Sequence, residues 1–526
     1  MKIIRYIFSA IIGIALSFSC TGDLDQYPHI EETSKTVYTN VGNYKQVLAK
    51  LYASFVICGQ EKGGGNKDFA TNKGYDYLRS YINMQELTSD EVAYTWSGEI
   101  FELCQHQWTS SNIFVSDMYY QIYFTISICN EFLRNSTDNA IAGFSDAEQK
   151  ELRTFRSEAR FLRALAYYHS LDMFGNVPFV DENDPVGGFL PPLYTQKEMF
   201  EFIAAELISL EAELPATSGS EYGRVNKATA NSLLAKLYLN AEVYTGKAYY
   251  TECIEACNKV LNEGYTLEQN YALLFNADNH KRTNEIIFAF SVDATHTMSW
   301  GATSYLICAC VSSSNGAQNP DDYGVKSGWT SFRAKGALTS KFDSNDKRNM
   351  FFTTDQSQTV TKLNDEFTGY LFEKWTNITD AGEIASNTAA DGACTDYPLF
   401  RLADVYLMYA EAALRGGTDA QGNALSNALT YVNKVRERAY GDQSGNISSG
   451  DLNLDFILDE RARELYLECT RRTDLIRYGK FTSGNYVWEF KGGVADGKAI
   501  DQKYNLFPIP STDLSANSNL VQNAGY

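Results

Sequence analysis

The chain has 526 residues, and 65 acidic against 45 basic side chains give it a formal net charge of −20. A surface this acidic repels phosphate backbones and anionic lipid headgroups, which argues against nucleic acid and electrostatic membrane docking. The length suffices for one large or two ordinary domains. Aromatic residues make up 13% of the chain, with 35 tyrosines, and tyrosine suits wet surfaces and sugars as well as helix packing.

The first thirty residues predict export. Lys2 and Arg5 precede an apolar run over 7–18, and Cys20 follows where a signal peptide would be cut. We expect residues 1–19 to be a signal peptide and Cys20 to carry a lipid anchor. The leucine of the usual lipidation pattern stands one position early, and plain secretion with an incidental Cys20 is the alternative. No later segment is apolar for the roughly 18 residues that a membrane span needs.

The ten cysteines do not form a metal-binding pattern. Without Cys20 nine remain, an odd number that cannot all pair within the chain, and no Cys-x-x-Cys motif is present. We expect most of them to be buried small apolar residues, with any disulfide left unassigned. Cys253 and Cys257 are expected on a helix, and Cys308 and Cys310 on a strand.

Helical periodicity marks much of the chain. Ser145 and Glu148 have the spacing of a capping box, and Thr195 and Asn226 begin further helices in a similar way. The short connecting loops resemble tetratricopeptide hairpins, although the strict repeat of about 34 residues is absent. We expect helices over residues 145–173, 195–214, 226–238, 249–262, 402–413, 427–439 and 455–469.

Irregular segments separate the helical ones. Residues 59–107 and 265–396 are rich in Gly, Ser, Asn, Thr and Asp, with a short strand predicted over 285–290. Long loops in a compact protein usually carry function. We therefore expect a mainly α fold in which a helix-hairpin scaffold carries an irregular ligand lobe with short strands. The scaffold would cover about 40–57, 115–265 and 397–480, and the lobe about 59–107, 266–396 and 482–505.

Several segments spread over the whole chain resemble one family. They are Cys20 to Asp25 with Pro28, and residues 156–179, 223–246, 397–414, 460–481 and 504–526. Together they resemble the SusD/RagB family of glycan-binding surface lipoproteins of Bacteroidetes. The resemblance implies that residues 20–526 form a single domain with four tetratricopeptide-like helix pairs and a less regular ligand lobe. It also implies that the protein binds oligosaccharides without cutting them and partners a SusC-like TonB-dependent transporter.

Three of the six tryptophans are candidate ligand contacts. Trp96, Trp300 and Trp329 lie in the irregular segments beside small or polar neighbours; taken alone, core packing would be the commoner role. The resemblance is strongest to the starch-binding founder of the family, and it implies that these residues match an aromatic arc around an α-1,4-glucan. It further implies that Arg79 hydrogen-bonds sugar hydroxyls. Glu99 stands where the founder has asparagine. The resemblance therefore does not determine the hydrogen bond to the ligand at this position or the sugar preference.

Stacking on indole rings fits weak sugar binding. The hydrocarbon face of a pyranose packs on an indole, and each stack is comparable to an aromatic pair at roughly 0.5–1.5 kcal/mol. Three stacks with a few charge-assisted hydrogen bonds, less ordering costs, correspond to millimolar to micromolar dissociation constants. Trp108 and Trp375 are expected to be structural.

Two other classes of function remain open. A glycoside hydrolase needs two carboxylates around the scissile bond, and Asp90, Glu91 and Glu99 near Trp96 are candidates, although solvated loop acids are the simpler interpretation. The chain has no G-x-S-x-G, H-E-x-x-H or P-loop motif, and His169 in an apolar helix stripe is expected in the core. A pure protein-interaction scaffold becomes the main function only if the loop tryptophans are buried.

The sequence thus predicts a lipid-anchored protein of the outer membrane that is exposed at the cell surface. We expect it to capture an oligosaccharide, starch or maltooligosaccharide first, and to deliver it to a TonB-dependent transporter. The same role for a different glycan is the alternative. No cofactor is expected. A structural calcium ion in acidic loops such as 276–279 is left open, although no spacing matches a defined calcium loop.

Overall fold

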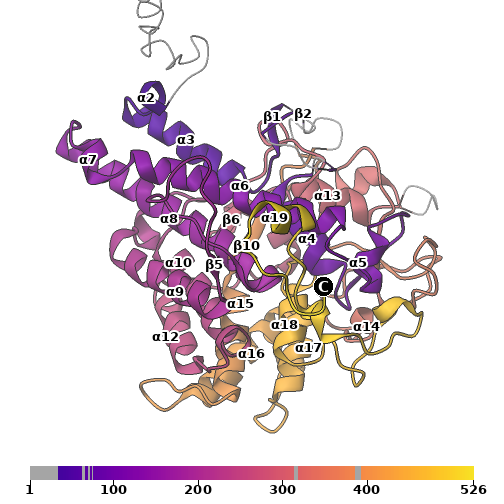
Figure 1. Cartoon of the computed structure of the whole chain (residues 1–526). Coiled ribbons are helices and arrows are strands. Elements are labelled where there is room, and N and C mark those ends of the chain that lie inside the picture. The colour runs from indigo at the N-terminus through magenta and orange to yellow at the C-terminus, as the bar shows by residue number, and fades with distance from the viewer. Residues whose placement is uncertain (1–33, 62–64, 69–71, 74, 313–317, 386–391) are drawn as a thin grey trace, which may run out of the picture. The chain divides into compact units, whose positions relative to one another are not determined.

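The structure is a computed structural model that describes residues 34–526 except 62–64, 69–71, 74, 313–317 and 386–391 (Figure 1). The predicted signal peptide and Cys20 lie outside the described residues. The chain divides into two compact units, Met1–Gln46 and Val47–Tyr526. The first contains α2 (Ser34–Val37) and the start of α3 (Val41–Ala53), and the second contains the other described elements. The single domain over 20–526 stays a prediction.

Long helices form the scaffold, and helices that follow one another in the chain lie side by side (Figure 1). They are α6 (Ile113–Asn135), α8 (Asp146–Phe174), α9 (Gln196–Glu213), α10 (Lys227–Leu239), α12 (Tyr250–Leu261), α15 (Leu402–Leu414), α16 (Ala424–Tyr440) and α17 (Leu454–Leu465). Helix α8 contacts α6 and α9, α10 contacts α9 and α12, and α15 contacts α12 and α16. Each apolar face is thereby covered by the next helix. The mainly helical fold class is confirmed.

Local hydrogen bonds determine where these helices begin. Ser145 and Glu148 form a capping box in front of α8, and Thr195 begins α9 in the same way. Asn226 caps α10 by accepting a hydrogen bond from the backbone N–H of Thr229. Replacing such a cap by alanine costs about 0.5–2 kcal/mol. The predicted starts of these three helices are confirmed.

Helix α8 runs through the core, and its histidine is structural. His169 is 2% exposed, and its Nδ1 lies 2.7 Å from the hydroxyl of Tyr77. Its ring stacks on Tyr81 with the centroids 4.3 Å apart. Burial lowers the pKa of His169 to about 3, so the imidazole is neutral at physiological pH. The core role expected for this residue is confirmed.

Shorter elements complete the fold, and the strands of the described chain pair only in antiparallel twos. The pairs are β1 (Gly59–Glu61) with β2 (Gly65–Lys67), β3 (Val92–Tyr94) with β7 (Phe332–Ala334), β4 (Val177–Pro178) with β5 (Leu193–Tyr194), β6 (Ile286–Phe290) with β10 (Tyr397–Arg401), and β8 (Phe351–Phe352) with β9 (Leu371–Phe372). The short α-helices are α4 (Tyr77–Glu86), α5 (Phe101–Gln105), α7 (Asp138–Ile141), α11 (Ala241–Thr245), α13 (Ala302–Cys310), α14 (Gly336–Thr339), α18 (Arg471–Arg477) and α19 (Ser511–Ala516). The 3-10 turns are η3 (Thr217–Gly219), η4 (Tyr271–Phe275), η5 (Asn279–Lys281), η6 (Pro320–Tyr323), η7 (Gln443–Gly445), η8 (Lys491–Gly493) and η9 (Gln502–Asn505).

Three of the sequence-based expectations were wrong. Helix α4 lies in the segment 59–107 expected to be irregular. Its apolar residues Tyr77, Leu78, Tyr81 and Ile82 recur at helical spacing, a signal that the prediction did not use, and the polar residues on its opposite face are buried as well. Cys308 and Cys310 lie on α13, not on a strand, because a short continuous apolar run does not distinguish the two. The helix expected to end at 469 stops at Leu465, since Leu467 has a left-handed φ of 58°.

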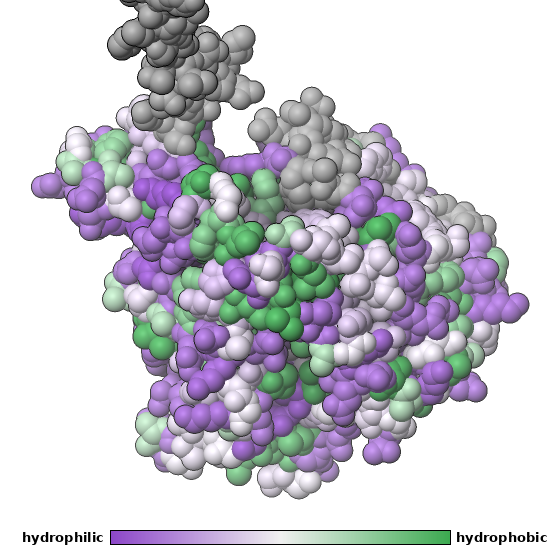
Figure 2. Space-filling model, viewed as in Figure 1, coloured by the Kyte–Doolittle hydropathy of each residue, from purple (hydrophilic) through white to green (hydrophobic). Residues whose placement is uncertain are grey.

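The cysteines are buried, as their number and spacing predicted, and the viewed surface mixes polar and apolar residues. Of the nine cysteines in the described part of the chain, eight are buried and Cys394 is partly buried, as expected for small apolar side chains. Among those same residues no helix combines the length and apolar character that a bilayer span requires. Figure 2 shows apolar residues in patches among polar ones across the viewed face.

Buried ion pairs hold the irregular segments against the last scaffold helices. Arg401 contacts both Glu464 and Glu468, and all three side chains are at most 4% exposed. Asp90 accepts two hydrogen bonds of 2.8 Å from Arg471. Burial alone would raise the pKa of Asp90, but the Arg471 guanidinium holds it well below its usual range. The interpretation of Asp90 and Glu91 as solvated loop acids was therefore wrong.

Two buried carboxyl groups lie at the junction between the irregular segments and the last scaffold helices. Glu86, at the end of α4, and Glu91 interact side chain to side chain. Glu86 accepts a hydrogen bond of 2.6 Å from the N–H of Cys469, and Glu91 accepts one of 3.1 Å from the N–H of Leu467. Burial raises the pKa of Glu86 to about 7, and burial together with the Glu86 charge raises the pKa of Glu91 well above its usual value. The pair therefore retains protons at neutral pH that the unfolded chain has released.

This proton retention predicts that stability falls as the pH rises. A carboxyl group with a raised folded pKa stabilises the fold at low pH and loses that contribution as the pH passes the folded value. The glutamine of Glu91→Gln keeps an acceptor for Leu467 and donates an N–H in place of the retained proton. Between pH 7 and 8 we expect the free energy of unfolding of the wild type to fall more steeply with pH than that of the variant, by at most the roughly 1.4 kcal/mol per pH unit that one fully retained proton gives. Urea titrations at each pH measure it.

A second buried acid supplies the matched control. Burial raises the pKa of Asp396 to about 6, so Asp396→Asn should change the pH slope below pH 6 and leave the interval from pH 7 to 8 as in the wild type. Equal slopes for the wild type and Glu91→Gln over that interval would contradict the retained proton.

Candidate functional site

Pairing of β3 with β7 brings two of the predicted tryptophans together. In this pair Tyr94 lies opposite Phe332, and Trp96 follows β3 directly. The indole Nε1 of Trp96 donates a hydrogen bond of 2.9 Å to the backbone carbonyl of Trp329, a residue 233 positions away. The backbone N–H of Thr95 donates to the carbonyl of Ser331 at 2.9 Å. The strand pair thus places both indoles at one end of β3.

Helix α13 positions the third tryptophan. Trp300 lies just before α13, and the N–H of Trp329 donates to the carbonyl of Cys308 near the end of that helix at 2.6 Å. The rings of Trp300 and Trp329 are 6.2 Å apart and inclined by 47°. A methyl group on Gly328 would lie 2.4 Å from the carbonyl oxygen of Val311. Only glycine therefore allows this close approach of the chain to α13.

The three indoles form one open surface, which we name the tryptophan platform (Trp96, Trp300 and Trp329). Trp96 is 45% exposed, Trp300 is 44% exposed and Trp329 is half-buried. Trp108 and Trp375, by contrast, are each 1% exposed, as expected for structural residues. Exposed indoles that lie together on a shallow surface leave ring faces available for stacking.

Arg79 lies beneath the platform. It is 3% exposed, and its guanidinium carbon is 3.6 Å from the ring centroid of Tyr75 and 4.1 Å from that of Tyr305. Its Nη1 donates to the backbone carbonyl of Trp300, while its buried Nε has no hydrogen-bond partner within the described residues. Arg79 thus supports the aromatic residues by cation–π contacts. Its predicted hydrogen bond to a sugar stays a prediction.

Glu99 lies on the exposed loop between Trp96 and α5. Gly98 turns the chain there with a φ of 104°, a value that favours glycine. The side chain of Glu99 is exposed, and its backbone carbonyl accepts a hydrogen bond of 3.3 Å from Asn112. Its carboxylate is therefore accessible from the solvent near the platform, and its contact with a ligand stays a prediction.

Comparison with known sequences identifies the family. A sequence model described as the SusD family matches residues 232–526, more than half of the chain. The chain belongs to the SusD family. A second model, described as "Starch-binding associating with outer membrane", matches residues 24–239. The family expected from the sequence segments is confirmed.

Known relatives of this SusD-family chain match all or most of its length. "Starch-binding protein SusD" of Bacteroides thetaiotaomicron is 32% identical, with 100% of this chain and 99% of the relative covered. "SusD-like protein P2" of Formosa agariphila is 26% identical, with 82% of this chain and 84% of the relative covered.

Solved structures share the SusD fold. A SusD superfamily protein from Bacteroides vulgatus ATCC 8482 has a TM-score of 0.71 at 18% identity, covering 93% of this chain and 99% of that one. "Surface glycan-binding protein A from Bacteroides thetaiotaomicron in complex with laminarihexaose" has a TM-score of 0.69 at 19% identity, covering 92% and 100%. At these identities the comparison concerns the fold alone.

Sequence reasoning missed residues that build this SusD-family site. Asp76, the N-cap of α4, accepts hydrogen bonds from the N–H of Arg79 at 2.8 Å and from the hydroxyl of Ser299 at 2.5 Å. Tyr305 stacks on Arg79 and donates to Asn83 at 2.7 Å. An aspartate three residues before Arg79 fits an N-cap, a signal that went unused because α4 was not expected.

The carboxylates near the platform do not form a hydrolase pair. Asp90 is tied to Arg471, and Glu91 is buried against Glu86. Neither can reach a ligand that stacks on the exposed rings, which leaves Glu99 as the accessible acid among the three weighed from the sequence. A glycosidase needs two carboxyl groups on either side of the bond. These three residues therefore do not supply that pair.

The acidic loop considered for calcium is occupied by internal contacts. Asn276 donates to Asp380 at 2.9 Å, and Asp278 pairs with Lys281 at 2.9 Å. Within the described residues no group of three or more His, Cys, Asp or Glu is arranged to hold a metal ion. Structural calcium therefore gains no support from this loop.

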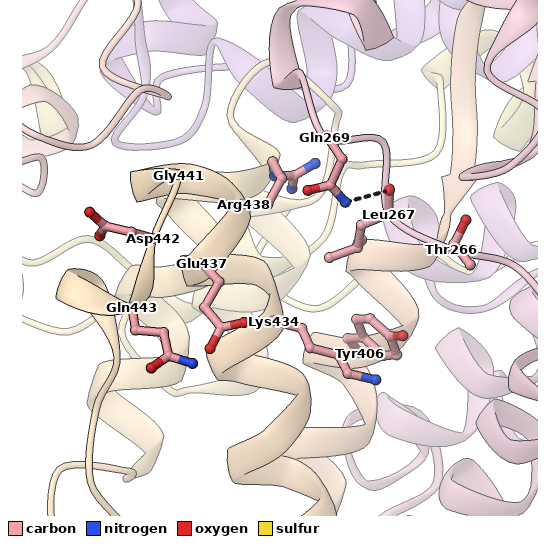
Figure 3. Close-up of a pocket in the computed structure, with 10 residues that line it drawn as sticks. All are labelled: Thr266, Leu267, Gln269, Tyr406, Lys434, Glu437, Arg438, Gly441, Asp442 and Gln443. Atoms are coloured by element: carbon pink, nitrogen blue, oxygen red, sulfur yellow. Dashed lines mark hydrogen bonds between the residues drawn. The ribbon is translucent and has the colours of Figure 1, made fainter.

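The scaffold carries a separate hollow of about 430 Å³ (Figure 3). Tyr406 on α15 and Lys434 and Glu437 on α16 line it together with the loop that holds Leu267 and Gln269. Its rim mixes both charges, and no tryptophan contributes to it. For a SusD-family protein the exposed platform, and not this hollow, matches the sequence-based expectation, because a stacking surface needs open ring faces and not an enclosed volume.

The close packing of Gly301 against Asp76 predicts that this position accepts only glycine without a loss of stability. A methyl group on Gly301 would lie 1.7 Å from Oδ2 of Asp76. We expect Gly301→Ala to lower the free energy of unfolding by about 1–3 kcal/mol, measured by urea denaturation. Gly188→Ala is the matched control, because its added methyl meets no atom within 4 Å. Equal losses in the two variants would contradict the packing described here.

Proposed function

We propose that this chain is a cell-surface glycan-binding protein that captures an oligosaccharide of the starch or maltooligosaccharide class on the tryptophan platform. The single observation that supports this most is the convergence of Trp96, Trp300 and Trp329 on one exposed surface. The relative at 32% identity is named a starch-binding protein. Membership of the SusD family favours glycan binding, and in this proposal the sugar rings stack on the exposed indoles of the platform.

The inclination of the rings favours a curved glycan. Trp300 and Trp329 are inclined by 47°, so two sugar rings stacked on them would also be inclined. An α-1,4-glucan curves in this way, whereas a flat ribbon-like chain would fit coplanar rings. Each stack contributes roughly 0.5–1.5 kcal/mol. The resulting affinity is weak and reversible, which suits a protein that passes its ligand on.

Polar groups beside the platform would add to the stacking. In this proposal the carboxylate of Glu99 accepts hydrogen bonds from sugar hydroxyls, and Arg79 donates to the ligand where its guanidinium is reached. Charge-assisted hydrogen bonds of this type contribute about 1.5–3 kcal/mol each. Because Arg79 is 3% exposed, Glu99 is the more accessible of the two.

The proposal is binding without catalysis, followed by delivery to a SusC-like TonB-dependent transporter. The scaffold helices offer a surface for that partner, and the buried state of Asp90 and Glu91 argues against a hydrolase site beside the platform. Reducing-sugar release from maltooligosaccharides by the pure protein would instead favour a glycoside hydrolase. The absence of binding to any glycan would favour a protein-interaction scaffold.

Removing the platform rings should weaken glycan binding without unfolding the protein. We expect Trp96→Ala and Trp300→Ala each to weaken the binding of maltoheptaose by roughly 2- to 12-fold, the loss of one stack. Isothermal titration calorimetry measures the affinity, and the melting temperature should change little because both rings are exposed. Phe367→Ala is the matched control, since Phe367 is also 45% exposed and lies outside the platform.

A glycan panel separates the substrate class from the general role. Affinity electrophoresis with amylopectin, levan, xylan and mannan should show retardation by amylopectin. Retardation by another glycan that is lost in Trp300→Ala would replace the substrate and keep the site. Retardation that persists unchanged in both Trp96→Ala and Trp300→Ala would remove the platform as the binding site.

Lipid anchoring is proposed at Cys20. We expect Cys20→Ala to abolish labelling with radioactive palmitate and to release the protein from the outer-membrane fraction, because the lipid on Cys20 would be the membrane anchor. Cell fractionation and immunoblotting measure this. Cys394→Ala, which changes a partly buried cysteine, should stay in the membrane fraction. An unlabelled wild type would favour plain secretion, and unchanged labelling of Cys20→Ala would place the lipid at another residue.

A further inference from the structure

The residues that carry Trp300 are fixed to the first turn of α4. Asp76 is fully buried and accepts hydrogen bonds from the Ser299 hydroxyl at 2.5 Å and from the N–H of Ala302 at 3.3 Å. It also accepts one of 2.8 Å from the N–H of Arg79, which makes it the N-cap of α4. One carboxylate thus links the start of a buried helix to both sides of Trp300.

The segment 299–302 fits this carboxylate closely. The Ser299 hydroxyl accepts a hydrogen bond of 3.0 Å from the N–H of Gly301, and a methyl group on Gly301 would collide with Asp76. Ala302 has a left-handed φ of 46° although it carries a side chain, a conformation that persists only when the surroundings enforce it. The hydrogen bond from Ala302 to Asp76 is one such constraint.

Arg79 completes the attachment from the other side. Its Nη1 donates to the carbonyl of Trp300, and its guanidinium lies between Tyr75 and Tyr305. Within 299–302, Ser299 and Ala302 are at most 5% exposed, whereas Trp300 is 44% exposed. The backbone on both sides of Trp300 is therefore immobilised in the interior while its indole faces the solvent.

We propose that Asp76 is the positioning residue that sets the direction of the Trp300 indole and thereby the shape of the glycan platform. This inference rests on the proposed function, and it adds a residue that cannot touch the ligand. Four constraints meet at the carboxylate: the cap of α4, the Ser299 hydroxyl, the Ala302 N–H and the close packing of Gly301. A carboxylate can accept the three hydrogen bonds, from the Arg79 N–H, the Ser299 hydroxyl and the Ala302 N–H, at the same time. The amide of an asparagine presents donors of its own and cannot.

A double-mutant cycle tests this role. We expect Asp76→Asn to weaken the binding of maltoheptaose roughly 2- to 12-fold, as the loss of the Trp300 stack does. Because Asp76 acts through Trp300, adding Asp76→Asn to Trp300→Ala should produce no further loss. Acrylamide quenching of tryptophan fluorescence should differ between Asp76→Asn and the wild type, since the indole of Trp300 changes its exposure.

A buried aspartate at the opposite end of α4 is the matched control. Asp172 accepts hydrogen bonds from Gln85 at 3.2 Å, Tyr244 at 2.7 Å and Thr473 at 2.7 Å. Asp172→Asn removes a comparable buried carboxylate without contact to 299–302. We expect it to lower the melting temperature and to leave the affinity for maltoheptaose at the wild-type value.

Different results would contradict the positioning role of Asp76 and the proposed function. If the wild type and Trp300→Ala bind equally, the platform is not the binding site and the proposed function fails. If Trp300→Ala weakens binding while Asp76→Asn binds as the wild type does, or if the two losses add in the double variant, the positioning role is overturned. Should Asp76→Asn fail to fold, Ser299→Ala replaces it in the same cycle, with a smaller loss expected and the same non-additivity required.

Discussion

Helix α4 is the constraint on which the arrangement of this protein depends. All ten of its residues are buried, and each end holds a distant segment. At its start Asp76 holds the residues around Trp300, and at its end Glu86 accepts a hydrogen bond from Cys469. Tyr77 links the helix to α8 through His169. A helix packed on every side cannot shift without displacing its neighbours, so the tryptophan platform is fixed relative to the scaffold.

Buried charge gives the junction its specificity. Arg401 with Glu464, and Arg471 with Asp90, are ion pairs removed from solvent. Dehydrating such groups costs several kcal/mol, and removing one partner alone is strongly destabilising, at about 3–5 kcal/mol. Each of these pairs therefore constrains how the two segments that carry it can meet. The buried junction contrasts with the open platform, where exposed rings leave faces free for the proposed ligand.

The sequence predicted helices with local signals well and buried ones poorly. The capping residues Ser145 and Thr195 lie within three positions of their partners, so their hydrogen bonds can be inferred from spacing. Helix α4 has an apolar stripe at helical spacing that went unused, and the burial of its polar face depends on distant segments that no local pattern indicates. Asp90 and Glu91 occur in a polar segment that is typical of exposed loops, and their burial depends on Arg471 and Glu86, whose proximity no local pattern indicates.

The sequence by itself determined the mainly helical class, the starts of the capped helices, the family and the kind of side chain that a sugar would stack on. Only the tertiary structure decided that Trp96 and Trp329, 233 positions apart, share one surface, and that Arg79 supports the rings from beneath. The reason is physical. Helix starts depend on hydrogen bonds between neighbours in the chain, whereas the platform depends on the long-range pairing of β3 with β7 and on the packing of α4 against the segment 299–302.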